Sequence, residues 1–328
     1  TCCTALLTRV FASQTKEGNK KDNSSSISSN ADTDTKNRYA DLTPGKKNVN
    51  FSPWRLALLR FWANKLSVIG LVVVILMILI TVFAPLIATH DPTGIDYNAV
   101  LVAPSSEHLF GTDDLGRDIF SRVVWGGRES LRVGFLGITI AIVGAVILGI
   151  STGYIGGWID DLTQRIIEVF MAFPTILLLL SIVAALGPSL TTVLIALGVS
   201  SIPRYARLVR GSVLGVKNME YVNSARVIGA KDSRIMARYI MPNMMGPILV
   251  YATLGLGGAI MTTAGLSYIG LGAQPPSPEW GAMLNSGRSF LRTAWWMSVY
   301  PGLAVFIIVL CINLFGDGLR DALDPKTR

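Results

Sequence analysis

The chain has 328 residues, of which 51% are hydrophobic and only 15% are charged, and its mean hydropathy is +0.49. Soluble domains carry roughly a quarter charged residues, so this composition excludes an ordinary soluble protein and indicates a membrane protein. The net charge of +8 does not indicate nucleic-acid binding, because the basic residues cluster at the ends of apolar segments, as membrane topology requires.

The cysteines and histidines predict neither a disulfide framework nor a metal site. Cys2, Cys3 and Cys311 are too few and too scattered for a framework. Cys311 lies in an apolar run, where we expect it to act as a small hydrophobic residue. His90 and His108 lie in a polar loop but stand far apart in sequence, so we expect no metal to be bound between them.

Residues 1–50 differ in composition from everything that follows. The serine- and asparagine-rich run at 23–30 and the mixed charges around it cannot bury a core, which predicts a disordered polar tail. A cleaved signal peptide is the weaker alternative, since the tail lacks a long apolar region and a small-residue cleavage site. Residues 51–65 then form a basic, amphipathic approach to the membrane, with Trp54 and Trp62 suited to the interface.

Six membrane spans are expected in the remainder, residues 66–328. The first is a charge-free run at about 66–88, longer than the roughly 20 residues that cross the hydrocarbon. The other five are expected at about 133–155, 166–186, 190–208, 246–270 and 299–316. Residues 203–238 hold eight Arg or Lys against two acidic residues, so this loop is predicted to be cytoplasmic. Counting outward places both termini in the cytoplasm.

The stretch 108–122, between the first two spans, combines turn residues with charges. Gly111, Thr112 and Asp113 suit a turn and a helix start, and an apolar face follows it at Ile119, Phe120, Val123 and Val124. We expect a surface helix on the outer membrane face; a gate or a docking element is the alternative. The arginines of this loop lie on the outer side, against the usual rule, and neighbouring acids offset them.

The cytoplasmic loop, at about 209–243, carries more pattern than a simple connection needs. Segments 224–228 and 233–240 are compatible with helices, and Gly229 supplies a turn between them. Asp232 or Ser233 is the expected N-cap of the second helix, and Pro242 is expected to break the chain before the next span. Spacing alone leaves two interpretations open: a helix gripped by a cytosolic partner, and a helix lying on lipid headgroups.

Two later segments also invite alternative interpretations. The fifth span is rich in small residues, Gly258 among them, and Gly255, Ala259 and Thr263 recur every four residues, the spacing that lets helices pack closely. Packing is the first expectation for them and lining a transport pathway the second. In the outer loop that follows, the Pro275-Pro276 pair predicts a stiff, extended segment. Glu279 and Trp280 could contact an external protein or anchor at the interface.

The sequence also lacks several patterns. It has no Gly-x-x-x-x-Gly-Lys-Ser/Thr motif, so the chain is not expected to bind ATP through a P-loop. The span centres carry no ionisable residues, which argues against a proton-coupled transporter or a channel. No paired carboxylates, histidine cluster or activated nucleophile is apparent at membrane depth, so an enzyme is not expected.

The cytoplasmic loop resembles the EAA loop of ABC-importer permeases. The positions that recur in that loop are occupied here by Ala225, Gly229 and Met241-Pro242. The chain departs from the family pattern at its start, where Asn223 replaces an acidic residue and Ser224 replaces alanine. Three further stretches, 108–122, 270–284 and 313–325, resemble signatures of dipeptide, oligopeptide and nickel permeases. The resemblance covers residues 51–328 and is closest to the second permease subunit of peptide importers.

This resemblance implies an all-α membrane protein with six transmembrane helices, like a type I ABC importer permease in the cell membrane. It implies import of di- or oligopeptides, with nickel or another small solute as the alternative. ATP and Mg would be bound by one or two partner ATP-binding subunits, so this chain would hold no cofactor and would not be an enzyme. A homologous second permease, an extracytoplasmic binding protein and the lipid bilayer would be its other partners.

The resemblance also implies which residues carry the function. The coupling loop that meets the ATP-binding subunit would use Asn223, Ser224, Ala225, Gly229, Ala230, Lys231, Asp232 and Pro242. The family motifs of the outer loops fall on Gly111, Thr112, Asp113, Gly116, Arg117, Asp118, Pro275, Pro276, Glu279 and Trp280.

Overall fold

The computed structural model describes residues 53–323. The regular elements of this part are helices, and it contains no strand beyond an isolated bridge between Thr112 and Asp118. The predicted all-helical architecture is therefore confirmed for these residues. The predicted disordered tail, residues 1–50, lies outside the described residues.

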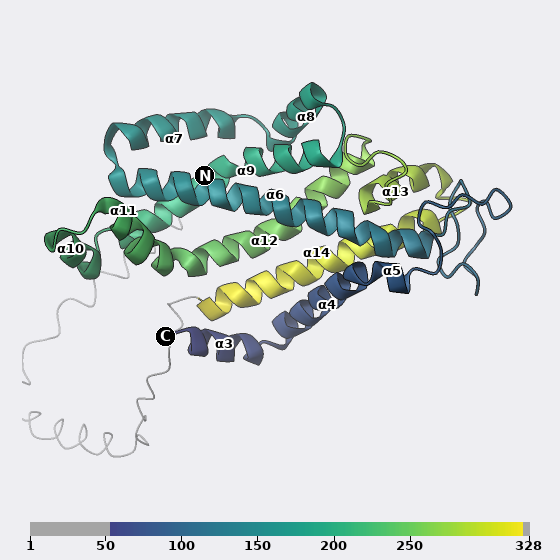
Figure 1. Ribbon diagram of the computed structural model, residues 1–328, viewed down its shortest axis with the longest axis horizontal. Helices are drawn as coiled ribbons and strands as arrows, with labels where there is room; N and C mark the ends of the chain where they lie inside the picture. Colours follow the sequence, from purple (N-terminus) through teal and green to yellow (C-terminus); the bar gives the residue numbers. More distant parts are fainter. Residues whose placement is uncertain (1–52, 324–328) are drawn as a thin grey trace, which may run out of the picture. The chain divides into compact units, whose positions relative to one another are not determined.

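Figure 1 shows the helices of the described chain. The N-terminal half contains α3 (Pro53–Ala63), α4 (Lys65–Val82), α5 (Ala84–Ile87), α6 (Ile119–Ile155), α7 (Gly157–Ala172) and α8 (Thr175–Leu186). The C-terminal half contains α9 (Leu190–Val216), α10 (Glu220–Val227), α11 (Asp232–Ile235), a π-helical turn (Met236–Ile240), α12 (Met241–Tyr268), α13 (Trp280–Gly287), a short 3₁₀ turn (Arg288–Phe290) and α14 (Trp296–Leu323).

Five of the described helical segments are long and apolar enough to cross a membrane, and a sixth span results if α7 and α8 count together. These segments correspond to the predicted spans, but the third prediction, 166–186, is wrong as a single helix. The pair α7 and α8 is bent by 88°. Phe173 at the bend has an extended backbone (φ −84°, ψ 135°), because the proline at 174 disfavours helical geometry in the residue before it.

The predicted surface helix after the 108–122 motif does not exist as a separate element. Its apolar residues form the first turns of α6, which runs unbroken through the predicted second span. The helix starts at Ile119, with Asp118 as its N-cap, and not at the Gly111 turn. The sequence pattern marked the helix correctly but gave no sign that it continues into the membrane.

Helix α6 packs along α9, and close backbone contact makes this possible. A Cβ atom at Gly149 would lie 2.8 Å from the carbonyl oxygen of Ala206 and from the Cβ of Val209. Only glycine allows the two helices to approach this closely, as is common between helices in lipid. Cys311, in α14, is buried, as expected for a small hydrophobic residue.

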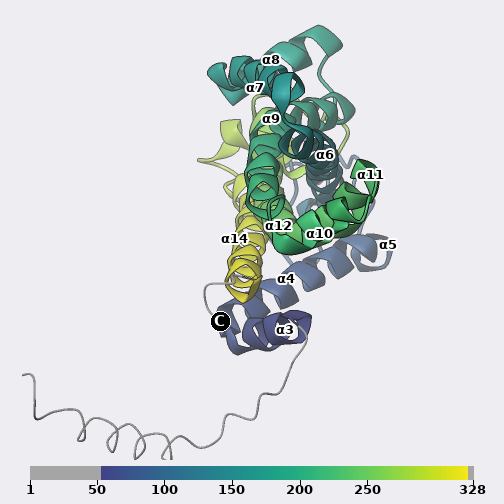
Figure 2. The ribbon, with the colours of Figure 1, turned by 90° about the vertical axis from the view of Figure 1, so that its left-hand side faces the viewer.

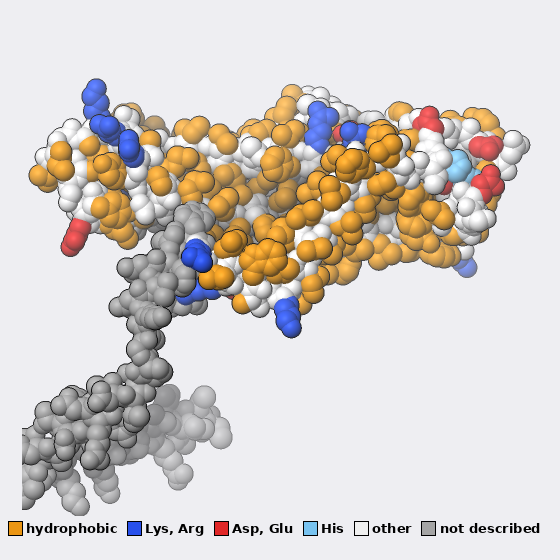
Figure 3. All heavy atoms as spheres, turned by 60° about the horizontal axis from the view of Figure 1, so that its bottom comes forward, with side chains coloured by type: hydrophobic (Ala, Val, Ile, Leu, Met, Phe, Trp, Pro, Cys, Tyr) orange, Lys and Arg blue, Asp and Glu red, His pale blue; other side chains and the backbone are white. Residues whose placement is uncertain are grey.

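The outer faces of the long helices carry exposed apolar side chains, such as Ile75 and Leu79 on α4 and Val143 on α6. Figure 3 shows hydrophobic side chains over most of the middle of one face. Acidic side chains gather at the end that holds the loop between α5 and α6. A bilayer around the middle would cover these apolar side chains, so the two ends of the helix bundle are where polar chemistry is found.

Candidate functional site

The loop between α9 and α12 lies at one end of the bundle, at the left of Figure 1, and Figure 2 shows α10 and α11 lying across that end. Helix α10 ends in a hydrogen-bonded turn: Ala230 N–H donates to Ala225 O (3.1 Å) and Gly229 N–H to Arg226 O (3.0 Å). This pair of bonds is a Schellman motif, which requires a left-handed residue. Gly229 supplies it, with φ +85°. The predicted glycine turn is confirmed.

Two details of the predicted loop are wrong. The N-cap of α11 is Lys231, whose side chain makes no capping bond, and not Asp232 or Ser233. Pro242 does not break the chain, because helix continues from α11 through the π-helical turn into α12. In that wider turn Met241 N–H donates to Met236 O, and Pro242 follows as the second residue of α12, where a missing N–H is tolerated.

The base of the loop is fixed to the end of α6. The Tyr154 hydroxyl donates to Asp232 Oδ1 at 2.7 Å, and the Arg226 guanidinium lies 5.7 Å from the centre of the Tyr154 ring. Val222 and Ile235 are fully buried in the same apolar cluster. A movement of α10 or α11 is therefore transmitted to the end of α6. Sequence reasoning missed Tyr154, because nothing local marks a tyrosine as the partner of an acid 78 residues away.

The tip of the loop carries an apolar pair in the open. Val227 is 87% exposed and Ile228 is 84% exposed. Beside them is a hollow of about 440 Å³ whose lining includes Gly229, Arg234 and Arg238. An exposed apolar tip next to a basic hollow is typical of a surface that a partner covers.

Asn223 and Ser224, where the chain departs from the family pattern, lie on α10. The Asn223 side chain donates to Asn218 O at 3.1 Å and accepts from Arg226 at 3.4 Å. Through these bonds Asn223 contacts other residues of the same loop. Ala225, two positions further along α10, is buried.

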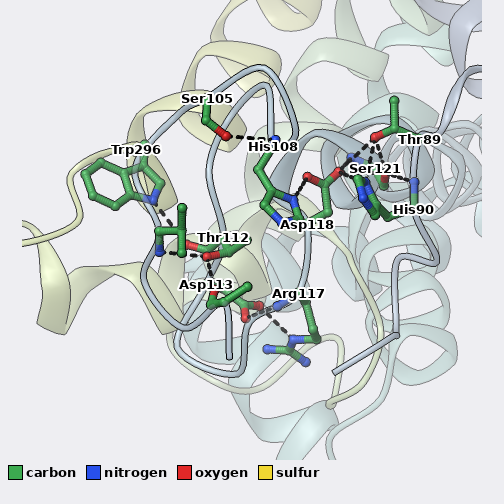
Figure 4. A network of polar contacts seen from close by, with 12 residues as sticks. Thr89, His90, Ser105, His108, Thr112, Asp113, Arg117, Asp118, Ser121 and Trp296 are labelled. Carbon is green, nitrogen blue, oxygen red and sulfur yellow. Dashed lines mark hydrogen bonds and ion pairs between the residues drawn. The ribbon is translucent and has the colours of Figure 1, made fainter. Parts of the chain in front are cut away.

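At the opposite end of the bundle, the 108–122 motif folds into a buried network of polar contacts (Figure 4). Asp113 Oδ1 accepts hydrogen bonds from the N–H groups of Leu115 and Arg117, both at 2.9 Å. Its Oδ2 lies 2.7 Å from Arg117 Nε and 3.7 Å from Arg122 Nε. These arginines are paired and buried, which explains why they do not follow the rule that places cations inside.

The same motif fastens the loop to α14. Gly111 and Gly116 both have φ +75°, and a Cβ at Gly111 would lie 2.6 Å from Val102 O. Thr112 O accepts from Trp296 Nε1 at 3.1 Å, and Thr112 Oγ1 accepts from Val102 N–H at 2.8 Å. The glycines allow a turn that is tight enough for these bonds.

Asp118 closes the network. It caps α6 by accepting from Ser121 N–H (2.8 Å) and Ser121 Oγ (2.7 Å), and it also lies 3.0 Å from His108 Nδ1. His90 and His108, which are far apart in sequence, have ring centroids only 4.8 Å apart. Their separation along the chain, on which the expectation of no shared metal rests, does not keep them apart in the fold.

Neither expectation for Glu279 and Trp280 holds, because both side chains are buried, at 0% and 1% exposure. Glu279 caps α13 by accepting from Ala282 N–H at 2.9 Å, and it accepts from Ser130 Oγ at 3.0 Å. Burial raises the pKa of the Glu279 carboxyl, although hydrogen bonds from backbone N–H groups oppose the shift. Trp280 Nε1 donates to Val123 O at 2.8 Å. They join α13 to α6 within the chain.

The Pro275-Pro276 pair forms a turn and not an extended segment. Ser277 N–H donates to Gln274 O at 3.1 Å, which closes the turn around the two prolines. The peptide bond between them is cis. Two prolines fix φ but leave the direction of the chain to its surroundings.

A hollow of about 690 Å³ lies between α9, α12 and α14, and sequence reasoning missed most of its lining. Its polar lining includes Ser201, Arg204, Tyr205, Thr262 and Asn313. Arg204 lies within α9, as the predicted span at 190–208 has it, and the helix continues beyond that span to Val216.

The small residues of α12 divide between packing and this hollow. Gly255 is in close contact with Tyr205, and Ala259 and Thr263 are buried, so these three serve packing. A Cβ at Gly258 would meet nothing within 4 Å, and Gly258 faces the hollow. Gly255 and Ala259 also reach its lining.

Comparison with known proteins identifies two matching family descriptions. Residues 145–328 match the binding-protein-dependent transport system inner membrane component. Residues 52–104 match the N-terminal TM domain of oligopeptide transport permease C. Together these matches include α4, the loop between α9 and α12, and the helices α12 and α14.

Curated relatives match along most of the chain. The dipeptide transport system permease protein DppC of Alkalihalophilus pseudofirmus is 47% identical over 285 residues, which cover 87% of this chain and 94% of the relative. The glutathione transport system permease protein GsiD of Pectobacterium atrosepticum is 44% identical over 278 residues, which cover 84% of this chain and 92% of the relative.

Among solved structures, an inward-facing conformation of the MetNI methionine ABC transporter matches with a TM-score of 0.51. The match covers 62% of this chain and 96% of that chain at 19% identity. At this level of identity the likeness concerns the fold alone.

Proposed function

Because the chain belongs to the family of binding-protein-dependent transport system inner membrane components, we propose that it is a permease subunit that imports short peptides with ATP hydrolysed by partner subunits. The observation that carries the proposal is the loop at 220–240, which exposes an apolar tip and is tied at its base to α6. Such a loop can transmit the movement of a partner next to the membrane to a helix within the membrane.

An ATP-binding subunit is the partner that we propose for the tip. If α10 instead lay on lipid headgroups, its apolar face would have to be free to enter the bilayer. Val222 and Ala225 on that helix are buried against the chain's own core, whereas Val227 and Ile228, at its end, are the most exposed apolar residues of the loop. A groove in a protein accounts for an exposed pair at a helix end better than a lipid surface does.

The orientation of the chain follows from the same loop. The eight cations of residues 203–238 favour the cytoplasm for this end, which puts both termini inside. The network around Asp113 and Asp118 would then face outward, where an extracytoplasmic binding protein delivers substrate. Glu279 and Trp280 support that surface from within and do not contact the binding protein.

A homologous second permease would complete the transport pathway. The hollow lined by Arg204, Tyr205 and Asn313 is the part of the pathway wall that this chain would contribute. In a membrane segment, an ionisable side chain that faces a cavity generally serves transport. We place ATP and Mg on the ATP-binding subunits, so that this chain catalyses no reaction of its own. The polar tail at 1–50, the approach at 51–65 and the permease domain at 66–328 complete the proposed organisation.

The names of the relatives favour peptides over nickel as the substrate, since the two described above transport a dipeptide and glutathione. The test is uptake of a labelled dipeptide and of radioactive nickel in cells with and without this gene. We expect deletion to abolish dipeptide uptake only, and the wild-type gene to restore it. Loss of nickel uptake alone would overturn the peptide assignment and leave the importer mechanism intact.

The Gly229 turn offers a test of coupling. Replacing Gly229 by valine should cost about 1–2 kcal/mol at this position, because a β-branched residue is forced into left-handed backbone geometry. No neighbouring atom lies within 4 Å of a Cβ there, so a steric clash is not the cause. We expect membrane insertion to be normal and peptide uptake to fall. Gly229→Asn is the matched control, since asparagine tolerates this geometry. Normal uptake by Gly229→Val would show that the turn does not matter for coupling.

A further inference from the structure

Both histidines of the chain meet at one point of its outer loops. The chain has only two, His90 and His108. His90 follows α5, and His108 precedes the Gly111 turn, yet their rings lie 4.8 Å apart and are inclined by 34°. Figure 4 shows them on either side of Asp118. The fold thus brings together groups that the sequence separates.

Asp118 supplies a third donor within reach of both rings. Its Oδ1 lies 3.0 Å from His108 Nδ1, and its Oδ2 lies 3.9 Å from His90 Nδ1. The ligand atoms of the three side chains all lie within 4.8 Å of one another. Tetrahedral zinc bound at 2.0–2.2 Å needs ligand atoms separated by roughly 3.4 Å. Small side-chain rotations would bring the three donors to that spacing.

The surroundings hold two of the donors in place and leave one side open. Asp118 is buried and fixed as the cap of α6 by Ser121, and only 11% of the His108 side chain is exposed. The His90 side chain is 39% exposed, which gives an ion a way in and leaves room for a water ligand. Thr89 Oγ1 is also 3.0 Å from His90 Nδ1, so an ion bound at that nitrogen would replace this contact.

We propose that His90, His108 and Asp118 form a binding site for a divalent transition metal ion, with Zn²⁺ as the best fit. Two imidazoles and one carboxylate suit zinc, whereas Ca²⁺ and Mg²⁺ prefer an all-oxygen set. The bound ion joins the segment after α5 to the start of α6. It stabilises the outer surface of the permease and is not the transported solute. This site is independent of the coupling loop and of the peptide assignment.

His90→Ala is the informative variant. The loop stays attached without the imidazole, because the backbone N–H of His90 donates to Ser121 Oγ at 3.0 Å. His108 and Asp118 are less useful, since they also hold the α6 cap. Glu107→Gln is the matched control: it removes an exposed carboxylate next to His108 that lies outside the donor set.

The experiment uses the assembled transporter, purified through a tag without histidines and stripped with EDTA. Zn²⁺ binding is measured by calorimetry and metal analysis, and thermal unfolding is followed with and without Zn²⁺. We expect wild type and Glu107→Gln to bind one Zn²⁺ more than His90→Ala, or at least about tenfold more tightly. Zn²⁺ should raise the unfolding temperature of these two proteins and not that of the variant.

Equal Zn²⁺ binding and equal thermal shifts in wild type and His90→Ala would overturn the proposal, as would the absence of Zn²⁺ binding by wild type. Unfolding in EDTA shows whether the variant is folded. If His90→Ala unfolds early even without metal, His90→Gln, which keeps a polar side chain of similar length, takes its place with the same criteria.

Discussion

Replacing both Val227 and Ile228 by aspartate is expected to abolish association with the ATP-binding subunits and, with it, transport. These are the most exposed apolar side chains of the loop, at 87% and 84%. Apolar anchors that fill a partner's groove contribute about 2 kcal/mol or more each, and a carboxylate there would also have to be desolvated. Affinity should therefore fall by at least about 30-fold for each position. Co-purification and uptake measure the effect.

The matched control exchanges the two residues, Val227→Ile with Ile228→Val, and keeps the apolar surface. We expect it to associate and transport normally. Charge reversal at Arg234 and Arg238, which line the adjacent hollow, should give a smaller loss of association. If the double aspartate variant still co-purified with the ATP-binding subunits, the tip would not be the docking surface. Unchanged association after the charge reversal would leave these arginines with a role in topology only.

Replacing Asp113 by alanine is expected to destabilise the permease by about 3–5 kcal/mol, because it removes the nearest carboxylate from two buried cations. Arg117 Nε lies 2.7 Å and Arg122 Nε 3.7 Å from the Asp113 carboxylate, and all three side chains are less than 9% exposed. The N–H groups of Leu115 and Arg117 also lose their acceptor. Thermal unfolding in detergent measures the loss.

Asp114 is the control for this prediction. Its side chain is 37% exposed, and its Oδ1 lies 3.8 Å from Arg117 Nη2, too far for a hydrogen bond, so this ion pair is weaker than the one at Asp113. Asp114→Ala should cost about 1 kcal/mol or less. Equal destabilisation by the two variants would mean that the loss of one negative charge, and not the buried geometry at Asp113, determines the stability of this region.

Features set by local chemistry could be predicted from the sequence. The long apolar runs located the spans, since crossing a bilayer demands length and hydrophobicity within one segment. Gly229 could be identified as a turn because only a residue tolerant of left-handed geometry fits between two helices. The predicted break at Pro242 is wrong. A residue without an N–H ends a helix only where no wider turn accommodates it, and the π-helical turn before α12 accommodates it here.

Features set by distant partners could not be predicted. Glu279 looks like a surface carboxylate until Ser130, 149 residues away, is seen to donate to it. Tyr154 and Asp232 are likewise joined across 78 residues, and nothing near either of them indicates the bond. The two histidines belong to the same class, because separation along the chain says little about separation in a folded loop. Residue type alone suggested solvent or an interface for Glu279, and packing decided otherwise.

Helix α6 has a consequence for how signals cross the membrane. Its 37 residues span about 55 Å, with Asp118 as its cap at one end and Tyr154, bonded to the loop between α9 and α12, near the other. A partner that binds one position of α6 more tightly at the outer end also shifts the equilibrium between the positions of the helix at its inner end. Thermodynamic linkage makes the effect reciprocal, so a partner at the inner end changes the affinity at the outer end by the same factor. A loaded binding protein that tightens the grip of the ATP-binding subunits must itself be held more tightly once they are in place.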